Sequence, residues 1–486
     1  MPISADDGGR NEISPKAAQY LNPGQQRKNS LTQVYDYEFR ERRHSMGSIG
    51  SAMGNCRGRW RVVIAITWAL LSALAVMFVL MFVADAPYAD EWEFVPVLVG
   101  AEPIGPALWA QHNEHRMPLS RAIYFITFRW TKDFRTGSLL QVAMLAILCL
   151  GLIRLVGRWR GQNDWTDLFF PLTLLHAGHW ENWVMGYQLC FSLYVVGVTL
   201  LAVVALTAER SSAVRTAWVG GALTLLVAAT GGFGLPVTLA MSLWLTFLAA
   251  LLWGEQRRRE ALIPLGMLLA ILAYLIAYFW DYRRPEHHPP LCTDWTKVLP
   301  VSAQVIAMGW GITAANLWPL AALGVLCPAS YLLWRMGRDH SSVPSRWGVM
   351  AVVVGQIGLA FAIGIGRGGF GADMGLWSRY SLLAWPLTGL CYLMAVRSGH
   401  RRVTIALCLA AALFFPGNMI QGLYYGGNVM MRQQALAADA AAGWPADRLV
   451  EHHFPGSFNA GQEERGRVAI PLLRQAGIGI FRSPPP

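Results

Sequence analysis

Charged residues are scarce in this chain. Asp, Glu, Lys and Arg together make up 14% of its 486 residues, whereas soluble proteins average about 25%. Hydrophobic residues account for 54% of the chain, and the mean hydropathy is +0.35. A chain of this length with so little charge is expected to have lipid, rather than water, around much of its surface.

Several motifs of catalytic and binding proteins are also missing. The seven cysteines are scattered, with no CxxC pair and no disulfide framework. The chain has neither a Walker motif nor an HExxH motif, which excludes these nucleotide- and zinc-binding signatures. Its net charge of +11 comes without an aromatic–basic nucleic-acid module. The Arg residues instead form short clusters between apolar runs, where they set membrane topology, so no nucleic-acid partner is expected.

Long apolar runs dominate what is present. Residues 62–84 form a run of 23 positions without a charge, enough to cross about 30 Å of hydrocarbon as a helix. Because backbone groups in lipid must bond internally, such runs predict helices rather than barrel strands. We therefore expect an all-α polytopic transmembrane bundle of about 11 helices (range about 10–13). The expected spans are residues 62–84, 138–156, 167–178, 189–206, 217–230, 235–253, 261–280, 314–334, 349–366, 381–396 and 403–416.

The Arg clusters support this order of spans. Every even-numbered span ends in one, and the positive-inside rule places these ends in the cytoplasm. Residues 1–55 are polar and without periodicity, which predicts a disordered cytoplasmic tail before a membrane domain at 56–416. An outer loop at 85–137 is expected to carry interfacial helices, and 417–486 to form a C-terminal non-cytoplasmic segment. Residues 298–314 fit either an interfacial helix or part of a span.

The outer loop begins with an acidic pair, Asp90 and Glu91, set between Tyr88 and Trp92. A carboxylate that is partly desolvated at a membrane interface has a raised proton affinity and can act as a general base. We therefore predict that Asp90 and Glu91 are catalytic. The alternative is that the acids of this loop only cap or solvate it, and the sequence leaves both interpretations open.

The motif HNEHR follows in the same loop. If it is helical, His112, His115 and Arg116 lie on one face, where they could hydrogen-bond a polar substrate or a phosphate. No zinc site is predicted, because no third ligand has a clear spacing. Arg116 and Arg121 either contact an anion or anchor a helix to lipid headgroups. The predicted substrate-binding residues in this motif are His112, Asn113, Glu114, His115 and Arg116.

A second polar cluster, HWENWVMGYQ, follows the third span. An interfacial aromatic belt explains its Trp and Tyr residues, but not Glu181, because an ionisable group at such depth usually faces a cavity. Aromatic faces beside carboxylates and amides also suit a sugar, since a pyranose has an apolar face and a polar rim. The residues predicted to bind substrate here are Trp180, Glu181, Asn182 and Gln188.

The third cluster is RGGFGADMGLWSRY, with Arg367 at the end of one span and Arg379 before the next. The positive-inside rule disfavours Arg on this side of the membrane, so each needs a reason, and a lipid-linked phosphate supplies one. The Gly residues let backbone approach a ligand closely or simply make a turn. We predict that Arg367, Arg379 and Tyr380 bind substrate.

Together these features resemble the GT-C class of membrane glycosyltransferases, in which an acidic residue follows the first transmembrane helix in a long outer loop. The motifs DEW, HNEHR, HWENWVMGYQ and GRGGFG…SRY are also similar to a bacterial group of GT-C-like multi-span proteins. The resemblance covers residues 85–380. It implies that Asp90 activates the acceptor hydroxyl, with Glu91 beside it, and that Arg367 and Arg379 bind the donor phosphate.

The resemblance also implies the partners and the location of the protein. The donor would be a polyprenyl-phosphate-linked sugar, and the acceptor a glycan, lipid or protein of the cell envelope. No cofactor is obligatory, and a divalent cation is optional, because a lipid phosphate is already a good leaving group. The expected location is the bacterial inner membrane, with the N-terminus cytoplasmic and the C-terminus periplasmic. The soluble C-terminal domain of oligosaccharyltransferases is missing, so acceptors that need it are not expected.

Three other functions remain open from the sequence. An O-antigen polymerase or ligase has many spans and outer Arg residues, but usually depends on Arg and His rather than on an acidic pair. A transporter or flippase of lipid-linked glycans would have internal repeats and polar residues near the midplane, and neither is apparent here. A non-catalytic partner of a membrane complex would place no constraint on the chemistry of the outer loops.

Overall fold

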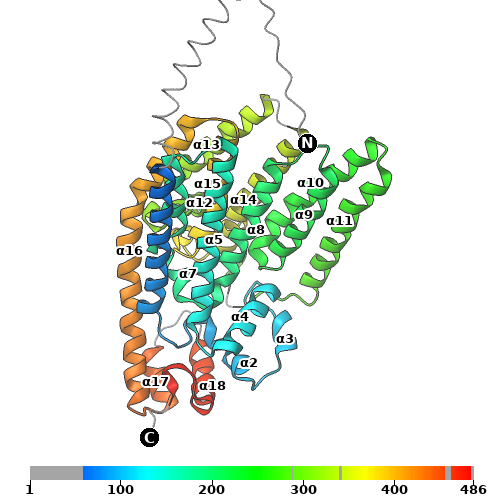
Figure 1. The fold of residues 1–486 in the computed structure, drawn as a ribbon. Coiled ribbons are helices and arrows are strands. Elements are labelled where there is room, and N and C mark those ends of the chain that lie inside the picture. The colour runs from blue at the N-terminus through cyan, green and yellow to red at the C-terminus, as the bar shows by residue number, and fades with distance from the viewer. Residues whose placement is uncertain (1–58, 287, 339–341, 455–460, 483–486) are drawn as a thin grey trace, which may run out of the picture. The chain divides into compact units, whose positions relative to one another are not determined.

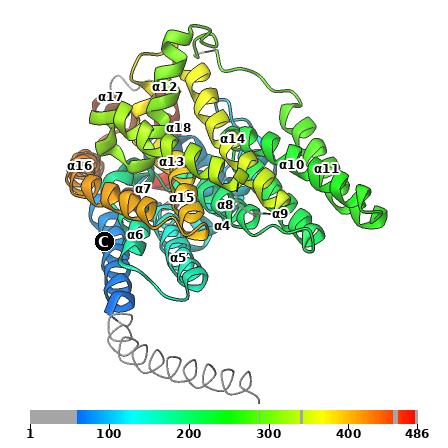
Figure 2. The same ribbon diagram turned by 90° about the horizontal axis from the view of Figure 1, so that it is seen from above.

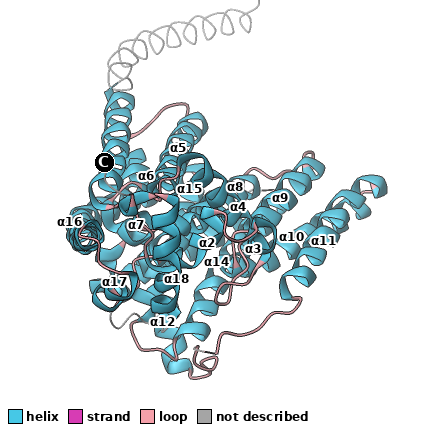
Figure 3. Ribbon diagram, turned by 90° about the horizontal axis from the view of Figure 1, so that it is seen from below, coloured by secondary structure: helices cyan, strands magenta, loops and turns pink. Residues whose placement is uncertain are grey.

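The computed structural model describes residues 59–286, 288–338, 342–454 and 461–482. Two compact units are distinguished, residues 1–62 and 63–486, and the fold below is that of the second. Within the described ranges all regular secondary structure is helical, as Figures 1 and 3 show. The predicted all-α class is therefore confirmed. The tail predicted at 1–55 lies outside the described residues.

Eight of the described helices are long and apolar enough to cross a membrane. Their outward faces are apolar: on α11 the side chains of Leu262, Leu269 and Leu272 are all more than half exposed. Such a surface is costly in water but not in lipid, so the chain is a polytopic helical membrane protein. The eight are Arg59–Phe82, α5 (Arg135–Arg160), α8 (Leu189–Leu206), α10 (Leu235–Gly254), α11 (Arg258–Phe279), α13 (Trp318–Arg338), α14 (Val343–Arg367) and α16 (Arg401–Ala441).

Two further helices correspond to predicted spans. The first, α9 (Ala213–Ala228), is 16 residues long. The second, α15 (Tyr380–Arg397), is buried at every residue from Tyr380 to Val396 and packs against α8, α13 and α16. Figure 2 shows α15 inside the bundle, with α11 and α16 on opposite sides. Since protein surrounds it, α15 holds its first residues in a fixed place.

The third predicted span, 167–178, is not one helix, and this prediction is corrected. Helix α6 ends at Leu174, and a second break follows at Met185, beyond the predicted span. Next to that break, Gly186 packs so closely on Gly137 that a Cβ on Gly137 would lie 2.7 Å from the Gly186 Cα. Broken backbone at membrane depth is tolerated where protein buries it, and here α5 and α16 cover it. The pieces are η3 (Trp165–Leu168), α6 (Phe169–Leu174), η4 (Ala177–His179), α7 (Trp180–Val184) and η5 (Gly186–Gln188).

The ambiguous segment 298–314 belongs to the bundle. Its helix α12 (Trp295–Ala307) packs along α14 and buries Val298, Val301 and Val305. Two short turns, η7 (Met308–Trp310) and η8 (Ile312–Leu317), then connect it to α13. Of the two alternatives left open by the sequence, packing into the bundle is the one observed.

The helix that contains the last predicted span does not end at Pro416. Helix α16 continues through Pro416 as a single helix of 41 residues, roughly 60 Å long at 1.5 Å per residue. The helix therefore continues past the predicted boundary between 416 and 417, because a proline is tolerated inside a helix that is packed against neighbours. Beyond α16 lie α17 (Ala446–His453), α18 (Gly461–Ala476) and η10 (Gly479–Phe481).

The loop 85–137 contains helices, as expected. They are η2 (Ala89–Phe94), α2 (Val95–Val99), α3 (Ile104–Trp109) and α4 (Pro118–Thr131). Helix α18 packs against η2 and α2, and Figure 1 shows α2, α3 and α4 at the same end of the bundle as α17 and α18. The polar residues of this end surround the cavity described next.

Candidate functional site

The three predicted clusters meet at one cavity of about 340 Å³. The cavity lies where η2 and the turn after α3 face the first residues of α8, α10 and α15 and the last residues of α11 and α14. Segments almost 300 residues apart in sequence therefore share one wall. Its polar lining consists of Asp90, His112, Asn113, Glu114, His115, Gln188, Tyr187, Tyr278, Tyr282, Arg367, Arg379 and Tyr380.

The HNEHR motif is a tight turn and not a helix, which corrects the expected geometry. The backbone N–H of His112 donates to the carbonyl of His115 at 2.8 Å, and the N–H of His115 donates back at 2.9 Å. Asn113 has a φ of +47°, a left-handed conformation that Asn tolerates better than most residues. The turn directs His112, Asn113, Glu114 and His115 to the cavity.

Asp90 belongs to a chain of ion pairs. Its Oδ2 lies 3.5 Å from Nε2 of His112, and Nδ1 of the same ring lies 2.9 Å from Oε2 of Glu93. That oxygen also lies 2.9 Å from Nη2 of Arg465 on α18. Burial favours a neutral imidazole, but the hydrogen bonds and charges of Asp90 and Glu93 outweigh it and raise the pKa of His112 to about 9. His112 is thus a cation held between two carboxylates.

The same contacts keep Asp90 ionised. Burial raises the pKa of the Asp90 carboxyl, but the hydrogen bond and charge of His112, together with the charges of Arg379 and Arg465, bring that pKa below its ordinary value. Asp90 is also partly accessible, with 22% of its side chain exposed. It is therefore an ionised carboxylate at a cavity wall, which is the state that accepts a proton. Its lowered pKa is the reverse of the raised proton affinity expected from the sequence, because the neighbouring cations outweigh burial.

Glu91, its neighbour, does not line the cavity and is only 1% exposed. Its Oε1 accepts hydrogen bonds from the hydroxyl of Tyr124 at 2.7 Å and the backbone N–H of Tyr187 at 3.0 Å. Its Oε2 accepts from the N–H of Tyr88 at 2.9 Å. Burial raises the pKa of Glu91 to about 7, although these hydrogen bonds act to lower it. Glu91 therefore joins η2 to α4 and η5, a structural role that differs from the predicted catalytic one.

The pH dependence of stability tests this role of Glu91. Its pKa rises from 4.5 in the unfolded chain to about 7 in the folded protein. Between pH 4.5 and pH 7 the native state therefore binds this proton more tightly than the unfolded state does. Stability should then fall as the pH rises from 4.5 to 7, by about 3 kcal/mol in all, and level off above pH 7. Apparent melting temperatures measured across this range would show the slope. The Glu91→Gln variant should lack this component, and an unchanged slope in the variant would contradict the assignment.

Glu114 and Arg367 form the second ion pair of the cavity. The guanidinium of Arg367 hydrogen-bonds Oε1 of Glu114, and Nδ1 of His288 lies 3.3 Å from the other carboxylate oxygen. The Nε2 of His115 lies 3.8 Å from Glu114. Burial lowers the pKa of His115 to about 4, with the nearby charge of Arg367 acting in the same direction, so His115 is a neutral imidazole here. The pair connects the HNEHR turn to the end of α14.

Arg379 is positioned by the second predicted cluster. Its Nε lies 2.8 Å from Oε1 of Glu181, and Oε2 of Glu181 accepts from the Arg379 backbone N–H at 3.0 Å and from the hydroxyl of Ser378 at 2.6 Å. The guanidinium stacks on Trp377, 4.2 Å from the ring centroid. The side-chain amide of Asn182 donates to the Arg379 carbonyl at 3.4 Å. Glu181 and Asn182 therefore hold Arg379 at the cavity without lining it.

Two predicted substrate contacts lie elsewhere. Arg116 is 7% exposed and donates to the backbone carbonyls of Tyr278, Trp109 and Trp280, each at 2.9 Å. Trp180 stacks on Tyr425 of α16, with ring centroids 5.1 Å apart. Neither residue lines the cavity, so their geometry supports structural roles: Arg116 fastens the turn to the end of α11, and Trp180 packs the bundle.

Arg121, His179 of the second cluster and the nearby His176 are also part of the framework. Arg121 is 1% exposed and donates to the carbonyl of Ala107 at 2.6 Å, with its guanidinium over Phe94. His179 pairs with Ser381 at 2.7 Å, and His176 lies 3.4 Å from the amide of Asn418. These contacts connect α3 to α4 and the broken segment to α15 and α16.

No protein-family model, no curated protein and no solved structure matches this chain.

Three residues of this region have no recognisable signal in the sequence. Tyr278 donates from its hydroxyl to the Glu114 carbonyl at 3.3 Å, yet in sequence it is one more aromatic residue at a span end. Glu93 is one of several acids of the outer loop, and nothing in the sequence distinguishes it from the others. Arg465 lies in a C-terminal segment with no feature that relates it to residue 93, and only the packing of α18 against η2 brings the two together.

Proposed function

We propose that the protein is a membrane glycosyltransferase that moves a sugar from a polyprenyl-phosphate donor to a glycan, lipid or protein acceptor. The observation that carries the proposal is the single cavity that contains an ionised carboxylate, Asp90, together with two arginines, Arg367 and Arg379. Transfer from a lipid phosphate needs a base for the acceptor and cations for the leaving phosphate. The resemblance of the four motifs to GT-C proteins points to the same chemistry.

In the proposed reaction Asp90 accepts the proton of the acceptor hydroxyl as its oxygen attacks the anomeric carbon. The bond between that carbon and the phosphate oxygen breaks, and the electron pair leaves with the lipid phosphate. Arg367 and Arg379 stabilise the charge that develops on this phosphate. Attack opposite to the leaving group inverts the anomeric configuration. Every proton and charge in this scheme is accounted for by these three side chains.

The remaining lining suits a sugar ring. Tyr187, Tyr278, Tyr380 and Phe233 supply aromatic surface, and the amide of Gln188 supplies polar contacts. The volume of about 340 Å³ lies at the lower end of the roughly 300–1,000 Å³ usual for small-molecule sites. A single sugar with its phosphate is therefore a better fit than a long glycan, which would have to extend outside the cavity.

Charge at the helix ends supports a cavity facing away from the cytoplasm. Helices α8, α10 and α15 start beside the cavity. At their other ends, α8 is followed by Arg210, α10 is followed by Arg257 to Arg259, and α15 ends at Arg397. Basic residues at this opposite end favour a cytoplasmic location for it. We propose on this basis a bacterial inner-membrane enzyme whose site opens to the periplasm.

The direct test is turnover by purified protein. Incubation with a panel of polyprenyl-phosphate sugars and candidate acceptors should consume at least one donor and release the polyprenyl phosphate, as measured by mass spectrometry of the extracted lipids. Reconstituted vesicles offer the matching assay for transport. Movement of a lipid-linked glycan across the bilayer with no loss of donor would contradict transfer and support a flippase.

A further inference from the structure

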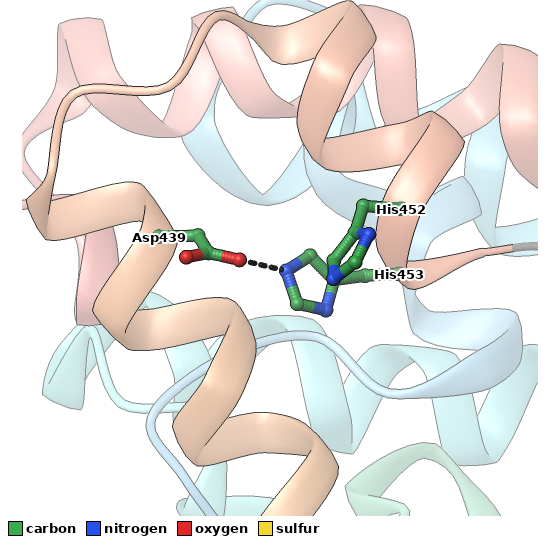
Figure 4. A group of neighbouring side chains, drawn as sticks. All are labelled: Asp439, His452 and His453. Atoms are coloured by element: carbon green, nitrogen blue, oxygen red, sulfur yellow. Dashed lines mark hydrogen bonds and ion pairs between the residues drawn. The ribbon is translucent and has the colours of Figure 1, made fainter.

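The C-terminal helices bring together three side chains of metal-ligating type. Asp439 lies in the last turn of α16, and His452 and His453 end α17. Between the two helices the chain reverses at Gly443, whose φ of +77° is one that L side chains rarely adopt. The reversal places the end of α17 beside the end of α16, and Figure 4 shows both imidazoles next to the Asp439 carboxylate.

The spacing of the three groups is close to that of a coordination site. Each offers one ligand atom, and these atoms all lie within 4.8 Å of one another, with Nε2 of His453 2.8 Å from Oδ2 of Asp439. Zinc–ligand bonds of about 2.0–2.1 Å place two tetrahedral ligand atoms roughly 3.3 Å apart. This value lies between the 2.8 Å that separates His453 from Asp439 and the 4.8 Å within which all three ligand atoms lie, so side-chain rotations can bring all three atoms to one ion. In the described part of the chain no other group of three or more such side chains converges in this way.

We propose that Asp439, His452 and His453 bind a zinc ion, with water as the fourth ligand. Two imidazoles and one carboxylate form a donor set typical of zinc, whereas calcium and magnesium prefer oxygen ligands. The ring of Trp444 packs edge-on against His452 with centroids 5.5 Å apart. His452 is exposed, so an ion from solution can reach the site.

The zinc ion would fasten helices that contact the proposed active site. Phe454, the residue after the two histidines, packs edge-on against Trp92 with ring centroids 5.1 Å apart, and Trp92 is two positions from Asp90. Helix α17 also packs on α18, which carries Arg465 to Glu93. Metal binding itself is independent of sugar transfer, but any influence of the ion on Asp90 rests on the proposed function.

A pair without metal is the competing interpretation, because Asp439 and His453 hydrogen-bond each other directly. The variant His452→Ala distinguishes the zinc site from the metal-free pair, since it removes a proposed ligand but leaves the hydrogen bond between Asp439 and His453 in place. His400→Ala is the matched control, because His400 precedes α16 at its far end. All variants should carry an affinity tag without histidine.

The experiment measures zinc bound to the full chain in detergent after chelation, addition of zinc and desalting. We expect about one zinc ion per native chain, loss of that ion in His452→Ala and His453→Ala, and its retention in His400→Ala. Zinc should also raise the melting temperature of the native protein and leave that of His452→Ala unchanged. Equal zinc content in the native protein and His452→Ala, or no retained zinc in the native protein, would overturn the proposal. This outcome does not depend on whether the protein transfers sugars.

Discussion

Asp90→Asn is expected to lower the rate of sugar transfer by about 10²- to 10⁴-fold, the usual effect of losing a general base. Asparagine has nearly the shape of aspartate and can still accept a hydrogen bond from His112, whose Nε2 lies 3.5 Å from the carboxylate. It cannot take the acceptor proton at neutral pH. The fold and donor binding should therefore be retained while turnover is lost. Release of polyprenyl phosphate, measured beside donor binding, would check both.

Asp133→Asn is the matched control for this variant. Asp133 is an acid of the same outer loop, pairs with Arg135 at 2.6 Å and does not line the cavity. Its replacement should leave turnover unchanged. If Asp90→Asn instead kept the native rate, the carboxylate would not be the base, and an O-antigen-type mechanism that depends on Arg and His would be favoured.

Arg379→Met is expected to reduce turnover by about 10²- to 10³-fold, the range found when a preorganised donor to a developing anion is removed. The side chain lines the cavity, and its charge is one of those that lower the pKa of Asp90. Methionine keeps much of the apolar volume beside Trp377 but removes the cation. Turnover with a fixed donor, compared under saturating and limiting donor, would show whether binding or the chemical step is affected.

Arg379→Lys distinguishes charge from geometry. Lysine keeps the positive charge but cannot present two parallel N–H donors to a phosphate, so intermediate activity is expected. Arg283→Met provides a surface control, because Arg283 is 85% exposed in the loop after α11. Full activity of Arg379→Met would remove this arginine from the proposed phosphate site and leave Arg367 as its candidate cation.

The surroundings of Asp90 and Glu91 show why residues that are neighbours in sequence can have different roles. Both are acids at the start of the same short helix, and composition alone does not distinguish them. Only the surrounding elements do: α4 and η5 enclose Glu91 with hydrogen-bond donors, while His112 and the cavity face Asp90. The choice between them therefore depends on contacts between segments up to about a hundred residues apart.

The helical class and most of the spans followed from local properties of the chain. A run such as 62–84 must become a helix in lipid, because every backbone group has to bond within its own segment. The three polar clusters were recognisable for a related reason, since ionisable groups at span ends are costly unless they have a function or a partner. Residues of all three clusters line the cavity.

Side-chain partners and breaks in helices required the tertiary structure. The interruption at 165–188 is stable only because neighbouring helices bury its backbone, and the continuation of α16 past Pro416 depends on similar packing. The sequence allowed Arg116 to contact an anion or to anchor a helix to headgroups, whereas its guanidinium donates to backbone carbonyls. The pairing of Arg465 with Glu93 and the approach of Asp439 to two histidines also arise from packing. Hydropathy acts along a few neighbouring residues, whereas these contacts join segments far apart in sequence, so no local pattern encodes them.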